Sequence, residues 1–189
     1  MNYLAHLFLA GHSAESLIGN LAGDFVKGRL GDQFPPGIRD GIMLHRRVDA
    51  FTDTHPAVAA FRRVLIPDHG HYSRVISDVF FDHFLATSWS RYSEESLEAF
   101  LDRVWATIDP HVDELPGRLR FIYPRMRREG WLLSYREARG IHIALTNLSH
   151  RLSRRPQLET ATHHLTDSRA ELERCFHQFF PAVVAFARK

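Results

Sequence analysis

Apolar residues recur at helical spacing along most of the chain, and glycine and proline gather between the periodic segments. From Ser13, a residue type that favours helix N-caps, apolar side chains follow every three or four positions and predict a helix that ends near Gly28. The same spacing predicts amphipathic helices over about 36–54, 73–90 and 93–109. Because strand-like alternation does not persist for long, the pattern predicts an all-α fold.

The C-terminal part of the chain continues the helical pattern beyond an arginine-rich stretch at 118–128. Helical spacing resumes at Trp131 and again from Ile141, and Gly140 between them predicts a break or a bend. Over the segment 158–186 a leucine or a phenylalanine stands at every seventh position. Such a seam fits either a coiled-coil dimer or one helix that packs across its own domain, and a compact chain favours the second.

Composition narrows the class of protein. With 189 residues, 44% of them hydrophobic and 24% charged, the chain is typical of one globular domain, and we expect a single helical bundle over 1–189. The formal net charge of +2 is far from the basic excess of a general nucleic-acid binder, so we expect no nucleic-acid partner. The single cysteine, the absence of a secretion-signal pattern and the absence of a long apolar run predict a cytoplasmic protein without a membrane partner.

Polar residues four positions apart interrupt the apolar faces of four segments, where a buried charge needs a partner or a metal ion. One such pair is ordinarily a surface or capping pair. Four pairs would bring repelling carboxylates together if the segments pack around one centre, and a divalent cation neutralises them most simply. Histidine and carboxylate ligands suit Mn, Fe, Zn or Mg. The pairs are Asn2 with His6, Asn20 with Asp24, His45 with Asp49, and Asp78 with Asp82.

The doublet Asp82-His83 leaves two arrangements open. Adjacent helical residues point about 100° apart, so both reach one metal ion only if it lies over the groove between them. Otherwise His83 packs in the core and Asp82 alone faces the centre. Two other histidine motifs are weaker signals: His69-Gly-His71 fits a metal site but is more simply a solvated loop, and His163-His164 is expected to be a solvated or capping pair.

Arginines give a second chemical signal. Arg46 follows His45 directly, and a guanidinium beside a metal ion suits phosphate oxygens because it donates hydrogen bonds as a planar fork. This arrangement favours phosphoryl chemistry, while P-loop, dinucleotide-binding, α/β-hydrolase and zincin motifs are absent from the sequence. Two arginine clusters form either a solvated face or a docking surface for an acidic partner: Arg118, Arg120, Arg125, Arg127 and Arg128, and Arg151, Arg154 and Arg155.

Several short motifs are spread over residues 1–156. They are Met1-Asn-Tyr-Leu-Ala-His, Gly19-Asn-Leu-Ala-Gly-Asp-Phe-Val-Lys-Gly, Phe34-Pro-Pro, Gly41-Ile-Met-Leu-His-Arg-Arg-Val-Asp-Ala-Phe-Thr-Asp, Asp78-Val-Phe-Phe-Asp-His-Phe-Leu and Ser153-Arg-Arg-Pro. In these motifs and their order the chain resembles the acyl carrier protein phosphodiesterase family. That family is similar to the HD-domain phosphohydrolases, which are helical metal enzymes, so the resemblance implies a divergent HD-like bundle. The Asp82-His83 doublet departs from the usual His-Asp order.

The resemblance implies hydrolysis of the phosphodiester that joins 4′-phosphopantetheine to a serine of acyl carrier protein, the expected partner. The implied cofactor is a divalent cation, Mn²⁺ first, with Mg²⁺ or Fe²⁺ as alternatives. The expected metal ligands are Asp24, His45, Asp78, Asp82 and His83, with Asp49 as a further ligand or as a residue that orients them.

The remaining implied roles concern substrate and partner. His6 and Asn20 are expected to line the site, with His6 as a proton donor, and Arg46 is expected to hold the phosphate. Two other functions fit the same residues, namely an HD-type nucleotide phosphohydrolase and a non-catalytic helical protein that binds the carrier without turnover. Carrier docking is assigned to Arg125, Arg127, Arg128, Arg151, Arg154 and Arg155.

Overall fold

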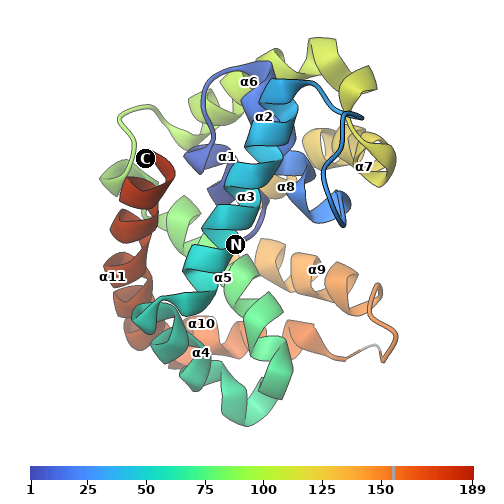
Figure 1. Cartoon of the computed structure of the whole chain (residues 1–189). Coiled ribbons are helices and arrows are strands. Elements are labelled where there is room, and N and C mark those ends of the chain that lie inside the picture. Colours follow the sequence, from blue (N-terminus) through green and yellow to red (C-terminus); the bar gives the residue numbers. More distant parts are fainter. Residues whose placement is uncertain (155) are drawn as a thin grey trace.

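The computed structural model describes residues 1–154 and 156–189, so Arg155, one of the expected docking residues, lies outside the described residues. Within those ranges the chain forms helices and no strand, which confirms the all-α prediction (Figure 1). The α-helices are α1 (Tyr3–Leu9), α2 (Ala14–Ala22), α3 (Pro36–Thr54), α4 (Pro56–His69), α5 (Ser73–Thr87), α6 (Leu97–Ile108), α7 (Gly117–Arg128), α8 (Trp131–Ser134), α9 (Ala138–Ser149), α10 (His164–Asp167) and α11 (Arg169–Ala187). The 3₁₀ turns are η1 (Gly23–Phe25), η2 (Gly70–Tyr72), η3 (Trp89–Arg91), η4 (Asp109–Glu114) and η5 (Leu158–His163).

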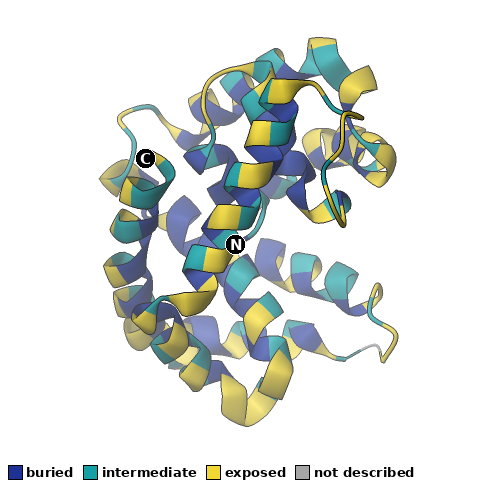
Figure 2. Ribbon diagram, viewed as in Figure 1, coloured by how far each residue is buried: buried dark blue, intermediate teal, exposed yellow. Residues whose placement is uncertain are grey.

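Helix α5 forms the centre of the core, and its residues 79–86 are all buried (Figure 2). Helices α1, α4, α9 and α11 pack around it. Phenylalanine rings of α5 contact Phe61 of α4 and Phe176 of α11. Burying one such ring contributes about 1.5–3 kcal/mol, so this aromatic centre is a main source of stability. Among the described residues, no helix combines the length and the apolarity needed to cross a bilayer.

Helices α2 and α3 cross at very short range because glycines face each other there. A Cβ atom on Gly19 would lie 2.4 Å from the carbonyl oxygen of Ile38 and 2.7 Å from the Cα atom of Gly41. Any larger side chain would push the helices apart, since a packed interior leaves no room for it. The close crossing brings Asn20, near the end of α2, next to His45, in the middle of α3.

The predicted helix over 36–54 is confirmed at both ends, and Pro36 occupies its first position, where a missing N–H costs nothing. The helix that starts after Ser13 is also confirmed, but its α-helical part ends at Ala22 and η1 carries it only to Phe25. Helix α6 begins later than expected because the hydroxyl of Ser96 accepts the N–H of Ala99 at 3.1 Å.

The expected single helix over 158–186 is wrong. The segment forms η5, α10 and α11, with a turn at Ser168 between the last two. Its Leu158, Leu172 and Phe179 side chains are buried in the chain's own core, as the second explanation of the seam requires. Gly140 lies inside α9, and the break falls just before that helix. Helices α1 and α4 were not expected from the pattern.

Candidate functional site

Two histidines and one aspartate meet where α1 packs against α3. The Nε2 atom of His6 lies 3.1 Å from Oδ1 of Asp49, and the Nε2 atom of His45 lies 3.2 Å from Oδ2 of the same carboxylate. The imidazole rings are stacked, with centroids 3.6 Å apart. One ligand atom of each residue lies within 4.8 Å of the others, a spacing that a single metal ion can bridge. We call His6, His45 and Asp49 the primary cluster.

Residues Asp24 and Asn20 support His45 from α2 and η1. The Nδ1 atom of His45 donates to the main-chain carbonyl of Asn20 at 2.8 Å, and this bond turns Nε2 toward Asp49 and Asp24. Oδ1 of Asp24 lies 3.7 Å from that Nε2 atom. The side-chain amide of Asn20 donates to the carbonyl of Ser16, and its buried Oδ1 atom has no hydrogen-bond partner. Asn20 therefore positions His45 through its backbone.

The N-terminal ammonium and Asp78 complete the charges beside the primary cluster. The Met1 nitrogen lies 3.0 Å from Oδ1 of Asp49 and 3.3 Å from Oδ1 of Asp78. Burial opposes its charge, but the two carboxylates outweigh burial and raise its pKa to about 10. Burial also raises the pKa of Asp78 above its ordinary value. A partly buried carboxyl whose charged form is disfavoured by its surroundings therefore lies next to the cluster.

The two stacked imidazoles have opposite protonation preferences. Burial lowers the pKa of His45, but hydrogen bonds and charges from Asp24 and Asp49 outweigh it and raise the pKa to about 9. Burial and the adjacent His45 cation lower the pKa of His6 to about 4. Despite burial, the hydrogen bonds from both rings hold the pKa of Asp49 far below its usual range. The Asp49 carboxylate thus stays ionised and contacts both stacked imidazole rings.

Asp82 and His83 have other contacts in the structure. Both carboxylate oxygens of Asp82 accept main-chain N–H groups at the start of α1, from Leu4 at 2.8 Å and from Ala5 at 3.0 Å. The Nδ1 atom of the buried His83 donates to the carbonyl of Tyr135 at 2.8 Å. The charges that act on His83 come from Arg169 and Glu173 of α11 rather than from the primary cluster. The charges of the Met1 ammonium and of Asp78 act on Asp82, so Asp82 lies beside the group of charges around the primary cluster, whereas the contacts of His83 are with Tyr135 and α11.

Arg46 also points away from the cluster. Its guanidinium donates to the carbonyl oxygens of Val26 and Gly28, both at 2.9 Å, and so fixes the loop that follows η1. By contrast, Arg118 and Arg151 line the cavity that contains Asp24, Asp49 and Asp78. Sequence reasoning placed Arg118 only in a cluster of surface charges. Arg118 reaches the cavity because α7 contacts η1, and no pattern in the sequence predicts that contact.

The other expected docking arginines differ in whether an acidic side chain of the chain pairs with them. Arg125 pairs with Glu129 at 2.9 Å, and Arg127 pairs with Asp109. Arg128 is 73% exposed, with its nearest carboxylate oxygen 3.9 Å away. Arg154 is exposed at the surface. Much of the positive charge of α7 is therefore neutralised by the chain's own acids.

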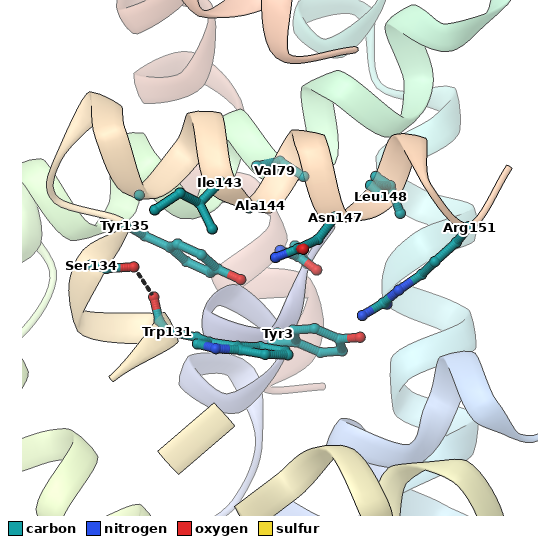
Figure 3. Close-up of a pocket in the computed structure, with 12 residues that line it drawn as sticks. Tyr3, Val79, Trp131, Ser134, Tyr135, Ile143, Ala144, Asn147, Leu148 and Arg151 are labelled. Carbon is teal, nitrogen blue, oxygen red and sulfur yellow. Dashed lines mark hydrogen bonds between the residues drawn. The ribbon is translucent and has the colours of Figure 1, made fainter. Parts of the chain in front are cut away.

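An aromatic pocket adjoins this cavity (Figure 3). Tyr3 and Arg151 line both spaces, so the pocket leads directly away from the primary cluster. In Figure 3 the rings of Tyr3 and Trp131 form one side of the pocket and Ile143 of α9 lies on the other. Asn147 points into the space between them. Of these residues only Tyr3 lies in one of the sequence motifs, because they come from α1, α8 and α9 and meet only in the fold.

Comparisons with known proteins identify a family to which the chain is similar. The chain matches the family described as acyl carrier protein phosphodiesterase over residues 1–183. It is 35% identical to the acyl carrier protein phosphodiesterase of Yersinia enterocolitica, and the match covers 100% of this chain and 98% of that protein. The proteins of the same name from Serratia proteamaculans and Escherichia coli O157:H7 are 37% and 34% identical over the same shares. No solved structure matches the chain. The chain belongs to the acyl carrier protein phosphodiesterase family.

Proposed function

We propose that this protein hydrolyses the phosphodiester between 4′-phosphopantetheine and the serine of holo-acyl carrier protein, giving apo-carrier and free 4′-phosphopantetheine. The observation that carries the proposal is the primary cluster, whose Asp49 lines a cavity that Arg118 and Arg151 also line. Anionic and imidazole ligands beside fixed guanidinium groups suit a reaction at a phosphoryl centre. Membership of a family whose members bear this name supports the same reaction.

We also propose that the primary cluster holds a divalent cation, with Mn²⁺ as the expected ion and Mg²⁺ or Fe²⁺ as alternatives. His6, His45 and Asp49 would hold it, with Asp24 beside them. The donor set fits, because the bond from Nδ1 of His45 to a carbonyl leaves Nε2 to the metal, as is usual for metal-bound imidazoles. A bound cation would supply Lewis-acid stabilisation of the phosphoryl oxygens and a water of lowered pKa.

Arg118 and Arg151 bind the phosphoryl oxygens in this proposal, since they line the cavity and Arg46 is engaged elsewhere. Asp78 protonates the leaving serine oxygen. Its pKa is raised by burial, and it lines the same cavity as Asp49, so it can carry a proton to that space. His6 is a ligand here rather than the proton donor expected from the sequence, because its Nε2 atom faces Asp49 with the other donors.

The aromatic pocket receives the pantetheine arm. That arm combines a branched apolar carbon with two amide groups, so it needs apolar walls with a few polar groups between them. Trp131, Tyr135 and Ile143 supply the apolar walls, and Asn147 and Ser134 supply groups for hydrogen bonds to amides. Because the pocket opens beside Arg151, an arm lying in it would place its phosphate at the primary cluster.

The acidic carrier docks on exposed arginines of the two predicted clusters. Arg118 and Arg151 are exposed and line the cavity, and Arg128 and Arg154 are exposed as well; among the described residues, none of these four arginines has a carboxylate oxygen within 3.5 Å. Interfacial charges of this kind chiefly speed encounter. We expect no nucleic-acid or membrane partner, and we propose a cytoplasmic location, supported by the single free cysteine, Cys175.

Mass spectrometry of the carrier tests the function. Holo-carrier is incubated with the purified protein and Mn²⁺, and we expect its mass to fall by that of the phosphopantetheine group. Chelation should stop the change and added Mn²⁺ should restore it. Free nucleotides are assayed alongside. An unchanged carrier with hydrolysed nucleotides would support the nucleotide phosphohydrolase, and an unchanged carrier that binds tightly would support the non-catalytic binding protein; either result would contradict the proposal.

A further inference from the structure

A second group of metal-ligand side chains lies where the end of α4 meets η5 and α10. The Oδ2 atom of Asp68 is 3.1 Å from Nε2 of His164 and 3.8 Å from Nε2 of His163. One ligand atom of each of these residues lies within 4.8 Å of the others. We call Asp68, His163 and His164 the second cluster. It shares no residue with the primary cluster or with the cavity beside it.

The histidines of the second cluster are oriented as metal ligands are. The Nδ1 atom of His163 donates to the carbonyl of Thr160 at 2.7 Å, and Nδ1 of His164 lies 3.4 Å from the hydroxyl of Ser168. In both rings the outer contact occupies Nδ1, so Nε2 is directed to Asp68. Metal-bound histidines show the same division, in which one nitrogen bonds the protein and the other binds the ion.

Buried nitrogens without partners are a further sign of a missing ligand. The Nε2 atom of His164 is close to Asp68, yet the geometry does not make a hydrogen bond and the nitrogen has no other partner. The Nε2 atom of His69, next to Asp68 in α4, is buried and unpartnered as well, and its ring lies 5.5 Å from that of His164. A cation bound beside Asp68 would give the Nε2 atom of His164 the partner that it lacks.

We propose that the second cluster binds Zn²⁺. Two imidazole nitrogens and one carboxylate form a set that Zn²⁺ accepts in tetrahedral geometry with a further ligand such as water, whereas Mg²⁺ and Ca²⁺ prefer oxygen ligands. The ion satisfies the buried, unpartnered Nε2 atom of His164. Expectation from the sequence placed the His163-His164 doublet in solvent, because only the fold brings α4 next to it.

Such an ion fastens two distant parts of the chain. It joins the C-terminal end of α4 to the junction of η5 and α10, which lie together in Figure 1. Because η5 also packs against α9, the ion steadies the helix that carries Ile143 and Asn147. Its role is structural, and it lies outside the cavity proposed for hydrolysis.

Metal counting on untagged protein tests the proposal. Wild-type protein is saturated with Zn²⁺ and desalted, and bound zinc per chain is measured and compared with that of His163→Ala and Asp68→Asn, whose side chains are about half exposed. We expect each variant to bind one ion fewer than wild type and to lose most of the rise in Tm that Zn²⁺ gives. His71→Ala is the matched control, since this exposed histidine follows the same helix but is outside the cluster.

The count also separates the second cluster from the primary one. His45→Ala should lose only the ion at the primary cluster, so a His45→Ala/His163→Ala double variant should bind none. The proposal is overturned if His163→Ala and Asp68→Asn bind as much zinc as wild type. It is equally overturned if His71→Ala loses as much zinc as they do, because binding would then be shared among surface histidines.

Discussion

At the scale of single residues, Asp82 shows how one spacing serves different purposes. It stands four positions after Asp78, just as Asp49 follows His45, yet its two oxygens hold the N–H groups of Leu4 and Ala5. A carboxylate at a helix N-terminus satisfies donors that the helix itself cannot. Asp82 therefore caps α1 from another helix, and α1 in turn carries His6 into the primary cluster.

Removing this cap should destabilise the protein. Asp82→Ala leaves two buried N–H groups without acceptors, and we expect the free energy of unfolding to fall by about 2–4 kcal/mol in a urea titration. Asp82→Asn keeps one acceptor oxygen and should lose less. Equal stability of Asp82→Ala and wild type would show that the capping bonds are not formed in solution.

The same residue should make stability depend on pH. Burial raises the pKa of Asp82 to about 7, although the amide donors pull it down, whereas the ordinary pKa of an aspartate is 3.8. The folded state therefore favours the protonated form, so this contribution is complete below about pH 4 and is lost as pH rises through 7. We expect wild type to lose stability relative to Asp82→Asn between pH 4.5 and 7.5, with chelator present. A difference that stays constant across this range would contradict the shifted pKa.

At the scale of elements, the crossing of α2 and α3 builds the primary cluster. Helix α3 was predictable in full because Pro36 marks its start and its apolar spacing is regular. Helix α1 was not, since seven residues form no stable helix alone and its cap comes from α5. Helix α4 was hidden by Pro67, which stands in its last turns. The polar residues of α2 and α3 are therefore neighbours, as expected, and of the two arrangements left open for Asp82-His83 the structure has His83 packed in the core.

The room for His45 depends on Gly23. A Cβ atom there would lie 2.2 Å from Cγ of the His45 ring, so Gly23→Ala must move that ring. We expect at least a tenfold loss of carrier hydrolysis and of Mn²⁺ affinity, measured by turnover and by titration calorimetry, with the helical circular dichroism unchanged. Gly31→Ala is the control, since its Cβ meets only the end of the Gln33 side chain. Full activity in Gly23→Ala would mean that His45 is not needed where it stands.

The aromatic pocket makes a separate prediction. Ile143 lines it and is 50% exposed, while Ile66 of α4 is 48% exposed away from it. A charge at position 143 opposes burial of the apolar arm, so Ile143→Asp should raise KM for holo-carrier about tenfold, which corresponds to about 1.4 kcal/mol. Hydrolysis of a small phosphodiester should stay as in wild type, and Ile66→Asp should change neither. Equal KM values for the two variants would place the arm elsewhere.

At the scale of the whole molecule, the small net charge does not show how the charges are distributed over the surface. The formal charge of +2 comes from balanced acids and bases, and on α7 the charges of Arg125 and Arg127 are paired with the chain's own acids. These arginines were expected to form a docking surface only because they lie close together in the sequence. Ion pairing between distant segments could not be foreseen, because Asp109 lies in another element.

Carrier docking should therefore depend on the free arginines. The double reversal Arg128→Glu/Arg154→Glu should raise KM for holo-carrier several-fold at low salt and flatten its salt dependence, with kcat unchanged, because exposed charges act through encounter. Arg188→Glu/Lys189→Glu, at the C-terminal end, is the charge-matched control. If the Arg128→Glu/Arg154→Glu variant and its control gave the same KM values over a range of NaCl concentrations, these arginines would be a solvated face.

The sequence specified the helical class and the residues from which the site is built better than it specified their partners. Spacing placed His45 and Asp49 on one face of α3, and the fold confirms that they face each other. It could not tell that Asp82 binds α1 or that Arg118 reaches the cavity, since both facts depend on packing between distant segments. The likeness to HD-domain enzymes stays a prediction.

The most direct test of the central claim compares two aspartates of α3. Asp49 joins both histidines of the primary cluster, whereas Asp53, one turn further on, pairs with Arg62, and the two side chains are 38% and 39% exposed. The measurement is the rate at which apo-carrier appears from holo-carrier at saturating Mn²⁺. We predict that Asp49→Asn loses at least a hundredfold in rate while Asp53→Asn stays within twofold of wild type. Similar rates for Asp49→Asn and Asp53→Asn would contradict the assignment of the primary cluster as the active site.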